Sequence, residues 1–403
     1  GMNFVDGALY ICDRNEVTKW TDTNDDGIPD ERETFSSGWI SDNYHHFTFG
    51  LPYDGENFYI TLSTNITFKK MIVEENIVGK IESLNGPNPE LRGTLLKIDG
   101  ETGEFEPVVG GLRTPNGVSL GPDNQIIIPD NQGAWKPSSM IYVAEPGAFY
   151  GHYNNTEATS DFYPDGGVPS LYSEKPITPP AIWIPQNECA NSPGNMVEIP
   201  EGQPYAGQYF MAEITKGGMR RVFFEEVDGT WQGAIFRHSH GFDSGLNRLT
   251  WGPDGNLYVG GMGASGNWSW KGKQFALHRM VPTGETAFEF EKVEVTKDGF
   301  RVTFTKPVDK AQLEDTEAWY VNAWTYKQTA RYGGPKIPKD KKEQVVPVDK
   351  AVASDDGMSV ELILADDRQP NHVYHIRTDA TSKDGDTMWT TEAWYTFHKA
   401  PAK

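Results

Sequence analysis

The sequence predicts an all-β protein, and three observations predict this class. Apolar and polar residues alternate over stretches of roughly four to seven residues, whereas helical periodicity is nearly absent. The 42 Gly and 27 Pro residues fall between these stretches, where turns are needed. In addition, one hairpin pattern recurs along the chain. Together these features favour a six-bladed β-propeller followed by an Ig-like β-sandwich.

Alternating stretches mark the strands that we expect in the first part of the chain. They are Ala8–Cys12, Asn57–Thr61, Gln125–Ile128, Gln208–Met211 and Leu257–Val259.

The recurring hairpin joins two strands through a tight turn of the Pro-Asp-Gly type. Its copies are Phe4–Tyr10, Leu51–Tyr59, Leu120–Ile126 and Trp251–Tyr258, with a weaker copy at Tyr205–Phe210. Repeats of roughly 40–70 residues with about four strands each are typical of propeller blades.

Five blade units are visible, and a closed ring without open edges requires a sixth sheet. This sheet lies either within 60–120 or 150–200, or in an N-terminal blade that precedes residue 1. The chain opens in the middle of a strand pair, which favours the second alternative.

The pattern changes near residue 283, so we expect a propeller over 1–283 and a separate sandwich over 284–403. The strands expected in the sandwich are Ala287–Glu294, Gly299–Thr305, Val345–Val348, Ser359–Leu364, His372–Arg377 and Ala393–His398.

The charge of the chain excludes several classes of partner. The 36 Lys and Arg against 57 Asp and Glu give a net charge of −21, most of it in residues 1–283. Such a surface repels nucleic acid and anionic lipid, whereas neutral carbohydrates and cations are compatible with it. No stretch approaches the ~18–20 consecutive apolar residues of a membrane span. Cys12 and Cys189 are too few for a disulfide framework; they are expected to be buried thiols, unless they meet in space and form one bridge.

The segment Asp22–Glu33 predicts a calcium site. It matches the pattern D-x-[DN]-x-[DN]-G-x5-E, in which oxygen ligands converge from a tight loop on a hard cation. Six acidic residues in twelve repel one another unless a cation lies among them. The alternative is a solvated acidic turn. The expected ligands are Asp22, Asn24, Asp26, the carbonyl of Ile28, Asp30 and Glu33.

Several other residues are candidates for a small-molecule site. His45 or His46 would serve as a general base, or would form a structural hydrogen bond in a channel wall. The cations Arg113, Lys216 and Arg248 would hold carboxylates, or would pair with the many acidic residues.

Polar and aromatic loops add candidates for substrate contact. We expect Asn187, Glu188 and Asn191 to bind sugar hydroxyls, unless they only shape a connecting turn. Trp268 and Trp270 would stack on pyranose rings, unless they only fill the channel of the propeller.

Four segments resemble a known family. They are Tyr10–Glu33; residues 111–117, 128–133 and 147–152 taken together; Thr215–Val222; and Asn247–Gly255. These segments are similar to the glucose/sorbosone dehydrogenase family of six-bladed propellers, in its secreted bacterial branch. The resemblance covers about 1–283 and implies a periplasmic or secreted protein whose signal peptide is not in this chain.

The resemblance implies the cofactor pyrroloquinoline quinone, with Arg113 and Lys216 as its clamp and Arg248 nearby. It also implies that Gln132 and Gly133 help to hold calcium. Asp130 and Asn131, in the same segment, are expected to contact substrate, and Arg113 to take part in catalysis.

The sequence departs from the family pattern at three points. Thr114 replaces an Asn, Arg248 is one position out of register, and no histidine is in register with the catalytic one. Three functions therefore stay open. They are hydride transfer from a sugar to a quinone, carbohydrate binding without redox activity, and non-redox processing of an oxidised sugar.

Overall fold

The computed structural model describes residues 1–41, 46–64, 66–69, 81–84, 91–152, 177–263, 273–329, 332–337 and 344–402. The chain divides into two compact units, which are described separately. The first comprises 1–180 and 328–334, and the second comprises 181–327 and 335–403. His45, Trp268 and Trp270 lie outside the described residues.

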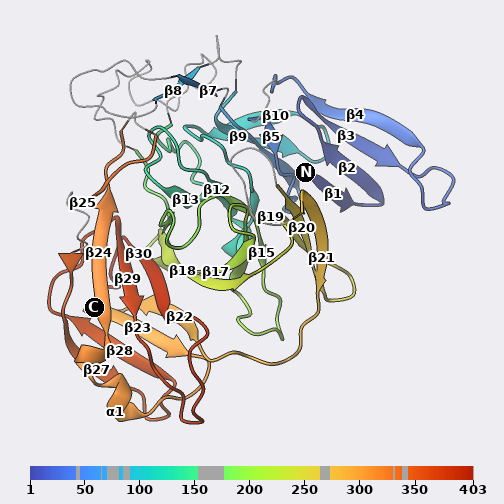
Figure 1. The fold of residues 1–403 in the computed structure, drawn as a ribbon. Helices are drawn as coiled ribbons and strands as arrows, with labels where there is room; N and C mark the ends of the chain where they lie inside the picture. Colours follow the sequence, from blue (N-terminus) through green and yellow to red (C-terminus); the bar gives the residue numbers. More distant parts are fainter. Residues whose placement is uncertain are drawn as a thin grey trace. The chain divides into compact units, whose positions relative to one another are not determined.

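The prediction of an all-β protein is confirmed (Figure 1). Within the described residues the only α-helix is the single turn α1 (Lys310–Leu313). No helix in this part of the chain is both long and apolar enough to cross a membrane. Cys12 and Cys189 are both buried and outside any disulfide, as predicted.

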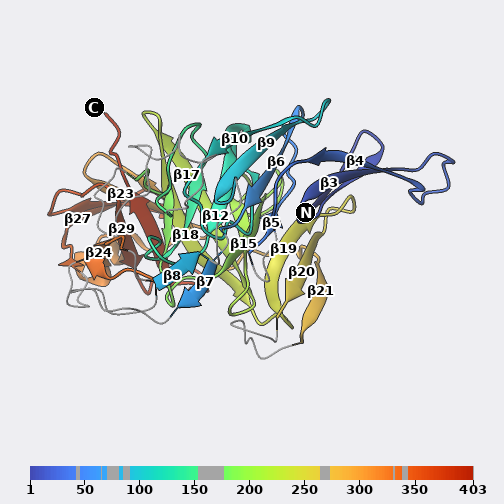
Figure 2. The same cartoon turned by 90° about the horizontal axis from the view of Figure 1, so that it is seen from above.

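The first unit contains two antiparallel sheets of four strands and a run of three strands, followed along Figure 1 from blue to green. The first sheet has the order β1-β2-β3-β4 and the second β10-β9-β6-β5, and Figure 2 labels the strands of the second sheet. Strands β11, β12 and β13 pair in that order, and among the described residues β13 is the last strand of this unit. Strands β7 and β8 pair with each other. The bounds are β1 Met2–Val5, β2 Ala8–Cys12, β3 Glu16–Thr21, β4 Glu31–Ser37, β5 Thr48–Phe49, β6 Asn57–Leu62, β7 Ile66–Lys69, β8 Ile81–Leu84, β9 Thr94–Asp99, β10 Phe105–Val109, β11 Ser119–Leu120, β12 Ile126–Asp130 and β13 Ser139–Val143.

The second unit begins with β14 (Ile182–Ile184) and contains two further blade-like sheets and a sandwich. The blade-like strands are β15 Pro193–Glu198, β16 Tyr209–Glu213, β17 Gly218–Val227, β18 Thr230–His240, β19 Gly245–Trp251, β20 Leu257–Met262 and β21 Phe275–Met280. The sandwich strands are β22 Phe290–Val295, β23 Gly299–Phe304, β24 Tyr320–Tyr326, β25 Lys336–Ile337, β26 Gln344–Val345, β27 Val348–Ala353, β28 Ser359–Leu364, β29 His372–Arg377 and β30 Glu392–Phe397.

The predicted hairpins are present at all five positions. Their turns connect β1 to β2, β5 to β6, β11 to β12, β15 to β16, and β19 to β20. Gly55 and Gly255 have φ of +104° and +74°, a conformation that favours glycine because it carries no Cβ. The Pro-Asp-Gly pattern therefore located the blade hairpins correctly.

The sandwich is continuous with a blade. Strand β18 pairs antiparallel with β30, with Gly233 opposite Thr396 and Phe236 opposite Ala393. This pairing joins β15–β18 and the strands β30, β29, β24 and β25 into one sheet, to which β26 adds a ninth strand. The boundary expected at 283 falls inside the second unit, and the closure of a propeller ring stays a prediction.

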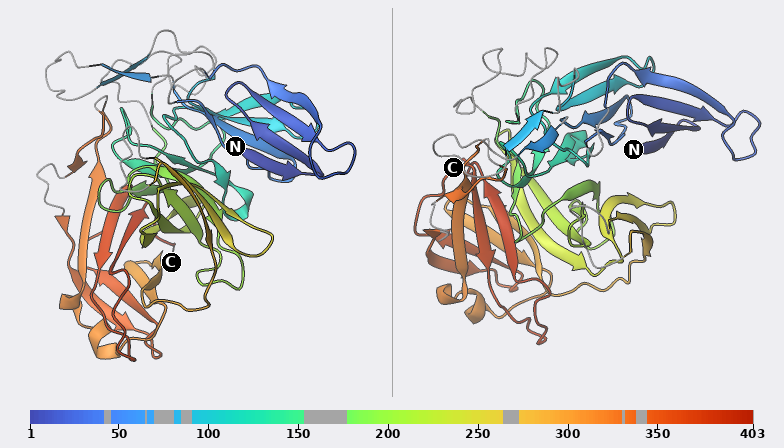
Figure 3. Two further views of the ribbon diagram at one scale, coloured as in Figure 1. Left: turned by 45° about the vertical axis from the view of Figure 1, so that its right-hand side comes forward. Right: turned by 45° about the horizontal axis from the view of Figure 1, so that its top comes forward.

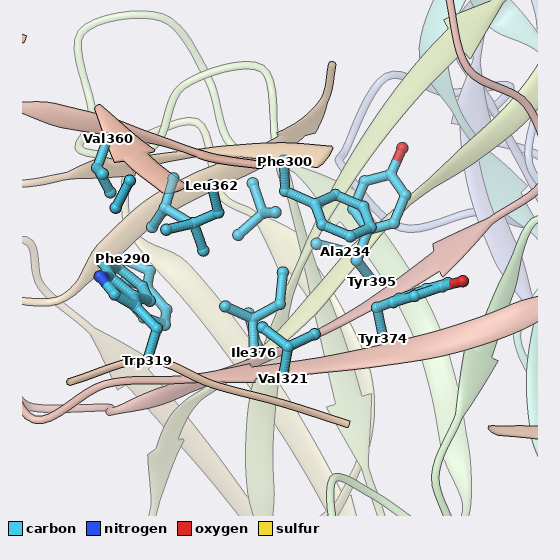
Figure 4. Packing of buried hydrophobic residues seen from close by; sticks show 14 of the residues in the cluster. Ala234, Phe290, Phe300, Trp319, Val321, Val360, Leu362, Tyr374, Ile376 and Tyr395 are labelled. Carbon is cyan, nitrogen blue, oxygen red and sulfur yellow. The ribbon is translucent and has the colours of Figure 1, made fainter. Parts of the chain in front are cut away.

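A large apolar core holds the sandwich together (Figure 4). Phe300, Val360 and Leu362 from the β22-β23-β28-β27 sheet face Val321, Ile376 and Tyr395 from the opposite sheet. Ala234 of blade strand β18 belongs to the same cluster. Period-two alternation in these strands places one side chain in two into this core.

A second core lies in the first unit, between its first two sheets. It includes Tyr10 and Val17 from the first sheet and Phe58, Ile60 and Ile98 from the second. Figure 3 shows the hairpin β3–β4 extending beyond these strands, with the acidic segment 22–30 at its tip. Burial of the two sheet faces leaves polar groups concentrated at the strand ends and loops.

Candidate functional site

Two blade strands end in a buried carboxylate. Strand β12 has the sequence IIIPD and ends at Asp130, while β16 has the sequence YFMAE and ends at Glu213. All five residues of each strand are buried. The apolar residues bury each strand. Because the acidic residue is the last residue of the same strand, its carboxylate is buried as well. A buried carboxylate needs hydrogen-bond donors or a cation.

Backbone amides surround the carboxylate of Asp130. The N–H groups of Arg113 and Thr114 donate to it at 3.0 and 2.7 Å, and the N–H of Asn131 donates at 2.9 Å. The side-chain amide of Asn131 donates to the carbonyl of Thr114 at 3.2 Å. Asp130 therefore fixes the loop 113–114 against the end of β12.

A fully buried lysine supplies the counter-charge. Lys136 Nζ lies 3.2 Å from Asp130 Oδ2 and donates to the Tyr142 hydroxyl at 2.7 Å and to the Tyr150 carbonyl at 2.5 Å. These three partners use all three donors of the ammonium group. Burial lowers the pKa of Lys136 to about 8, with a smaller lowering from Arg113, although the Asp130 charge acts in the opposite direction.

His46 lies beside the same loop, and its side chain is only 1% exposed. Its Nδ1 is 3.0 Å from the carbonyl of Thr64, which can only accept, so the neutral ring carries its proton on Nδ1. The hydroxyl of Thr114 lies 3.3 Å from Nδ1 and 3.2 Å from Nε2. The buried Arg92 donates to the carbonyls of His46 and Ser63, which fixes the backbone of this segment.

Arg113 is covered by a short arm of the chain. We name as the arm residues 328, 329 and 332–334, which leave the sandwich between β24 and β25 and belong to the first unit. The ring of Tyr332 lies over Arg113, with 5.2 Å between Cζ and the ring centroid. Arg113 Nη1 donates to Thr114 Oγ1 at 3.2 Å.

The arm is attached by backbone hydrogen bonds to the loop that follows β12. The N–H of Trp135 donates to the Thr329 carbonyl at 2.7 Å, and the N–H of Gly333 donates to the Gly133 carbonyl at 3.0 Å. Gly133 also packs on Arg113, because a Cβ at this position would lie 1.8 Å from Arg113 Nε.

The structure therefore brings together six of the residues that the sequence predicted for the site. They are His46, Arg113, Asp130, Asn131, Gln132 and Gly133. Sequence reasoning missed Lys136, Tyr142, Thr64 and Tyr332. A lone lysine directly after the apolar segment Gly133–Trp135 was a signal for a buried ammonium, but no signal in the sequence indicated that Tyr332 lies over Arg113.

In the second unit, Glu213 binds a loop in the same way as Asp130. It accepts the N–H groups of Asn191, Ser192, Thr215 and Lys216 at 3.2, 3.4, 3.1 and 2.8 Å. Its nearest described cation is Arg220, with Nη2 3.9 Å from Oε2. The side chain of Lys216 is exposed. The predicted convergence of Arg113 and Lys216 would join the two units and stays a prediction.

The polar loop 187–191 makes contacts within its own unit. Asn187 and Asn191 bond to each other, and Glu188 pairs with Lys336 at 2.6 Å. Arg248 Nη1 donates to the carbonyl and the side chain of Asn247 at 2.8 and 3.0 Å.

The acidic loop uses several of its predicted ligands as turn acceptors. Asp22 accepts the N–H groups of Asp26 and Gly27 at 3.2 and 2.6 Å, and Asp26 accepts that of Ile28 at 2.8 Å. Asp30 accepts from Thr23, and these bonds lower the pKa of Asp30.

Glu33, the expected closing ligand of that loop, makes an ion pair in this structure. It lies on β4 and pairs with Lys19 of β3 at 3.5 Å, because the loop runs directly into a strand. Among the described residues, no group of three or more His, Cys, Asp or Glu side chains is arranged to hold a metal. Calcium binding stays a prediction.

Comparisons with known proteins find no matching family model and no matching curated protein. Solved structures show a distant likeness to sugar dehydrogenases. The pyranose dehydrogenase domain from Coprinopsis cinerea is 13% identical, with a TM-score of 0.39, over 69% of this chain and 81% of that one. The aldose sugar dehydrogenase from Streptomyces coelicolor is 12% identical, with a TM-score of 0.37, over 69% and 92%. An AA12-family carbohydrate-active enzyme from Trichoderma reesei is 13% identical, with a TM-score of 0.42, over 69% and 80%.

Proposed function

We propose that the protein binds carbohydrate at the loop cluster of the first unit, formed by Arg113, Thr114, Asn131, Gln132 and Tyr332. The observation that carries the proposal is the position of Tyr332. Tyr332 is 36% exposed and its ring lies over Arg113, while the half-exposed amide of Gln132 lies next to the adjoining Gly333. An aromatic ring supported from below offers a surface for the apolar face of a sugar. Amide groups next to it both donate to and accept from sugar hydroxyls.

The charge of the chain is consistent with an uncharged ligand. The net charge of −21 repels anions, and Lys136, the cation deepest in the cluster, is used by Asp130. A neutral sugar needs neither a counter-charge nor the displacement of this ion pair.

Titration of the full chain with a panel of neutral mono- and disaccharides, followed by calorimetry, tests the proposal. We expect Tyr332→Ala and Asn131→Ala each to weaken binding about tenfold, the equivalent of ~1.4 kcal/mol. Tyr320→Ala is the matched control, because Tyr320 is an exposed tyrosine of the second unit. Unchanged binding in both site variants contradicts the proposal.

Pyrroloquinoline quinone carries three carboxylates, which need accessible cations or hydrogen-bond donors. Arg113 is 4% exposed and enclosed by Tyr332 and Gly133, while Lys136 is 0% exposed and bound to Asp130. The described residues of the first unit thus do not fit an open clamp for such a quinone. No reaction step is assigned to it.

A second candidate function, sugar oxidation, is favoured by one observation. His46, Arg113, Gln132 and Gly133 lie in one cluster, as the resemblance implies. In that function the Nε2 of His46 would remove the proton of a sugar hydroxyl. A dye-linked oxidation assay after addition of quinone and calcium tests this candidate. Because Tyr332 covers Arg113, Tyr332→Ala should raise quinone binding, and an inactive wild type and variant exclude the function.

We include a periplasmic or secreted location in the same proposal, since the protein would bind its sugars outside the cytoplasm. Fractionation of cells that produce the full-length protein tests it.

A further inference from the structure

A cavity of about 330 Å³ lies in the second unit, separate from the loop cluster of the first. Its walls come from the blade strands β16–β20, the end of β21, the segment 281–287 that leads into the sandwich, and the loop before β30. This volume falls in the range of about 300–1,000 Å³ that is typical of small-molecule sites.

Most of the wall is aromatic or aliphatic. The rings of Phe210 and Trp251 lie 6.4 Å apart at 37°, and the ring of His238 lies 4.8 Å from that of Phe210 at 35°. Trp389, which is 57% exposed, lies at the rim and donates to the His238 carbonyl at 2.6 Å. The wall therefore suits a flat apolar molecule.

A β-bulge brings His238 into this wall. In the pairing of β17 with β18, Met219 is opposite Ser239 and Arg220 is opposite Arg237, so His238 has no partner. An extra residue of this kind bends the strand and changes the direction of its side chain. Both His238 and Ser239 consequently line the cavity, although they are adjacent in the strand.

These two residues carry buried polar atoms that lack a protein partner. Nδ1 of His238 and Oγ of Ser239 have no hydrogen-bond partner among the described residues. Buried polar atoms without partners are uncommon, and each one needs an explanation. Both atoms are closed to solvent, so a ligand hydroxyl would satisfy them once the two side chains turn toward the cavity that they line.

The charges around the cavity favour a neutral ligand. Glu289 accepts from Tyr205 and from Thr390, and Arg221 lies 3.9 Å from it. Burial lowers the pKa of His238 to about 3, helped by Arg221 and Arg220, so the imidazole is neutral at physiological pH. The exposed Glu285 at the rim repels anions.

We propose that this cavity binds a neutral hydroxylated aromatic molecule. Its ring packs against Phe210 and Trp251, and its hydroxyl bonds to Nδ1 of His238.

The test compares 2-naphthol with naphthalene, which differ only by the hydroxyl, in fluorescence titrations of the full chain. We expect the wild type to bind 2-naphthol about tenfold more tightly than naphthalene, as one hydrogen bond allows. His238→Phe should reduce the affinity for 2-naphthol to that for naphthalene and leave naphthalene binding unchanged. The matched control is His372→Phe, since His372 lies on β29 and does not line the cavity.

Thr283→Trp is a second variant, and it leaves the β-bulge at His238 unchanged. Thr283 is an exposed residue of the wall, so a large side chain there should block both probes. The proposal is overturned if neither probe binds, if Thr283→Trp leaves binding unchanged, or if His238→Phe binds 2-naphthol as tightly as the wild type.

Discussion

Asp130 and Glu213 occupy the same place in two blades but are neutralised in different ways. Each ends the strand that follows a blade hairpin, and each accepts backbone N–H groups from the loop before that hairpin. Asp130 accepts three backbone amides, two from that loop and one from Asn131, and has a fully buried lysine at 3.2 Å. Glu213 has four amides, and Arg220 lies at 3.9 Å.

The difference shows that the blade provides the position of the carboxylate, whereas local loops provide its charge balance. A carboxylate held by many amides depends little on any one cation. A carboxylate with fewer amides depends on its lysine, and removal of one partner of a buried pair leaves an uncompensated charge.

The largest expected effect follows from Lys136→Met. It leaves Asp130 buried without its cation and should lower the free energy of unfolding by about 3–5 kcal/mol. Urea unfolding followed by tryptophan fluorescence measures the loss. The double variant Lys136→Met, Asp130→Asn should recover part of it, and a loss below ~1 kcal/mol in the single variant would show that the amides alone suffice.

The acidic loop 22–30 extends the comparison to exposed carboxylates. No buried lysine or arginine among the described residues pairs with them, so we expect a calcium ion to balance their charge. Calcium should stabilise the native state by ~2.7 kcal/mol at a hundredfold excess over its dissociation constant. Chelator should lower the melting temperature, and Asp26→Ala should abolish that response. Glu31→Gln is the control and should keep it, because Glu31 lies on β4 and is not among the expected ligands. A melting curve that chelator leaves unchanged argues against the site.

Arg220→Met should have a smaller effect than Lys136→Met. Four amides remain on Glu213, so the loss is chiefly the hydrogen bond of 2.6 Å from Arg220 Nε to the Cys189 carbonyl. We expect a decrease of about 1–3 kcal/mol in the same unfolding assay. A loss as large as that of Lys136→Met would refute the distinction between the two centres.

The last effect concerns pH and is the smallest when it is measured per pH unit. The pKa of Lys136 is about 8 in the folded protein, against 10.5 for an ordinary lysine, so between these values the unfolded chain binds more protons. Stability should therefore rise with pH in this window, by at most about 1.4 kcal/mol per unit. The difference in unfolding free energy between the wild type and the Lys136→Met, Asp130→Asn variant, measured from pH 7 to 10, tests this.

The matched control for that pH series is Arg220→Met, Glu213→Gln. The difference in unfolding free energy between this variant and the wild type should not change with pH, because arginine remains protonated throughout this range. An equal slope for both pairs would assign the pH dependence to other groups.

Local sequence predicted much of the fold. The hairpin turns at Gly55 and Gly255 need positive φ, which only a few residue types adopt readily, so the Pro-Asp-Gly pattern located them. The pairing of β18 with β30 was not predicted, because partners more than 150 residues apart leave no local signal. Strand alternation indicates the buried face, but it does not identify the neighbouring strand.

The residues of the candidate site also fall into two groups, those that the local sequence indicates and those that it does not. Asp130, Asn131 and Gln132 follow directly from the end of a strand and were found. The role of Lys136 depends on burial, which a single lysine in the sequence does not reveal, and Tyr332 reaches Arg113 from far along the chain. The motif did not reveal that Glu33 lies on a strand and pairs with Lys19, and its role as a calcium ligand stays a prediction.

The arm that carries Tyr332 has a consequence for the order in which the protein is completed on the ribosome. Residues 1–180 emerge first, but the arm belongs to their unit and follows about 150 residues later. At about 5–20 residues per second, this delay lasts roughly 8–30 s. During that interval the loop 133–137 lacks its backbone partners from the arm, and Arg113 lacks its cover. The first unit therefore reaches its final form only after most of the second has been synthesised.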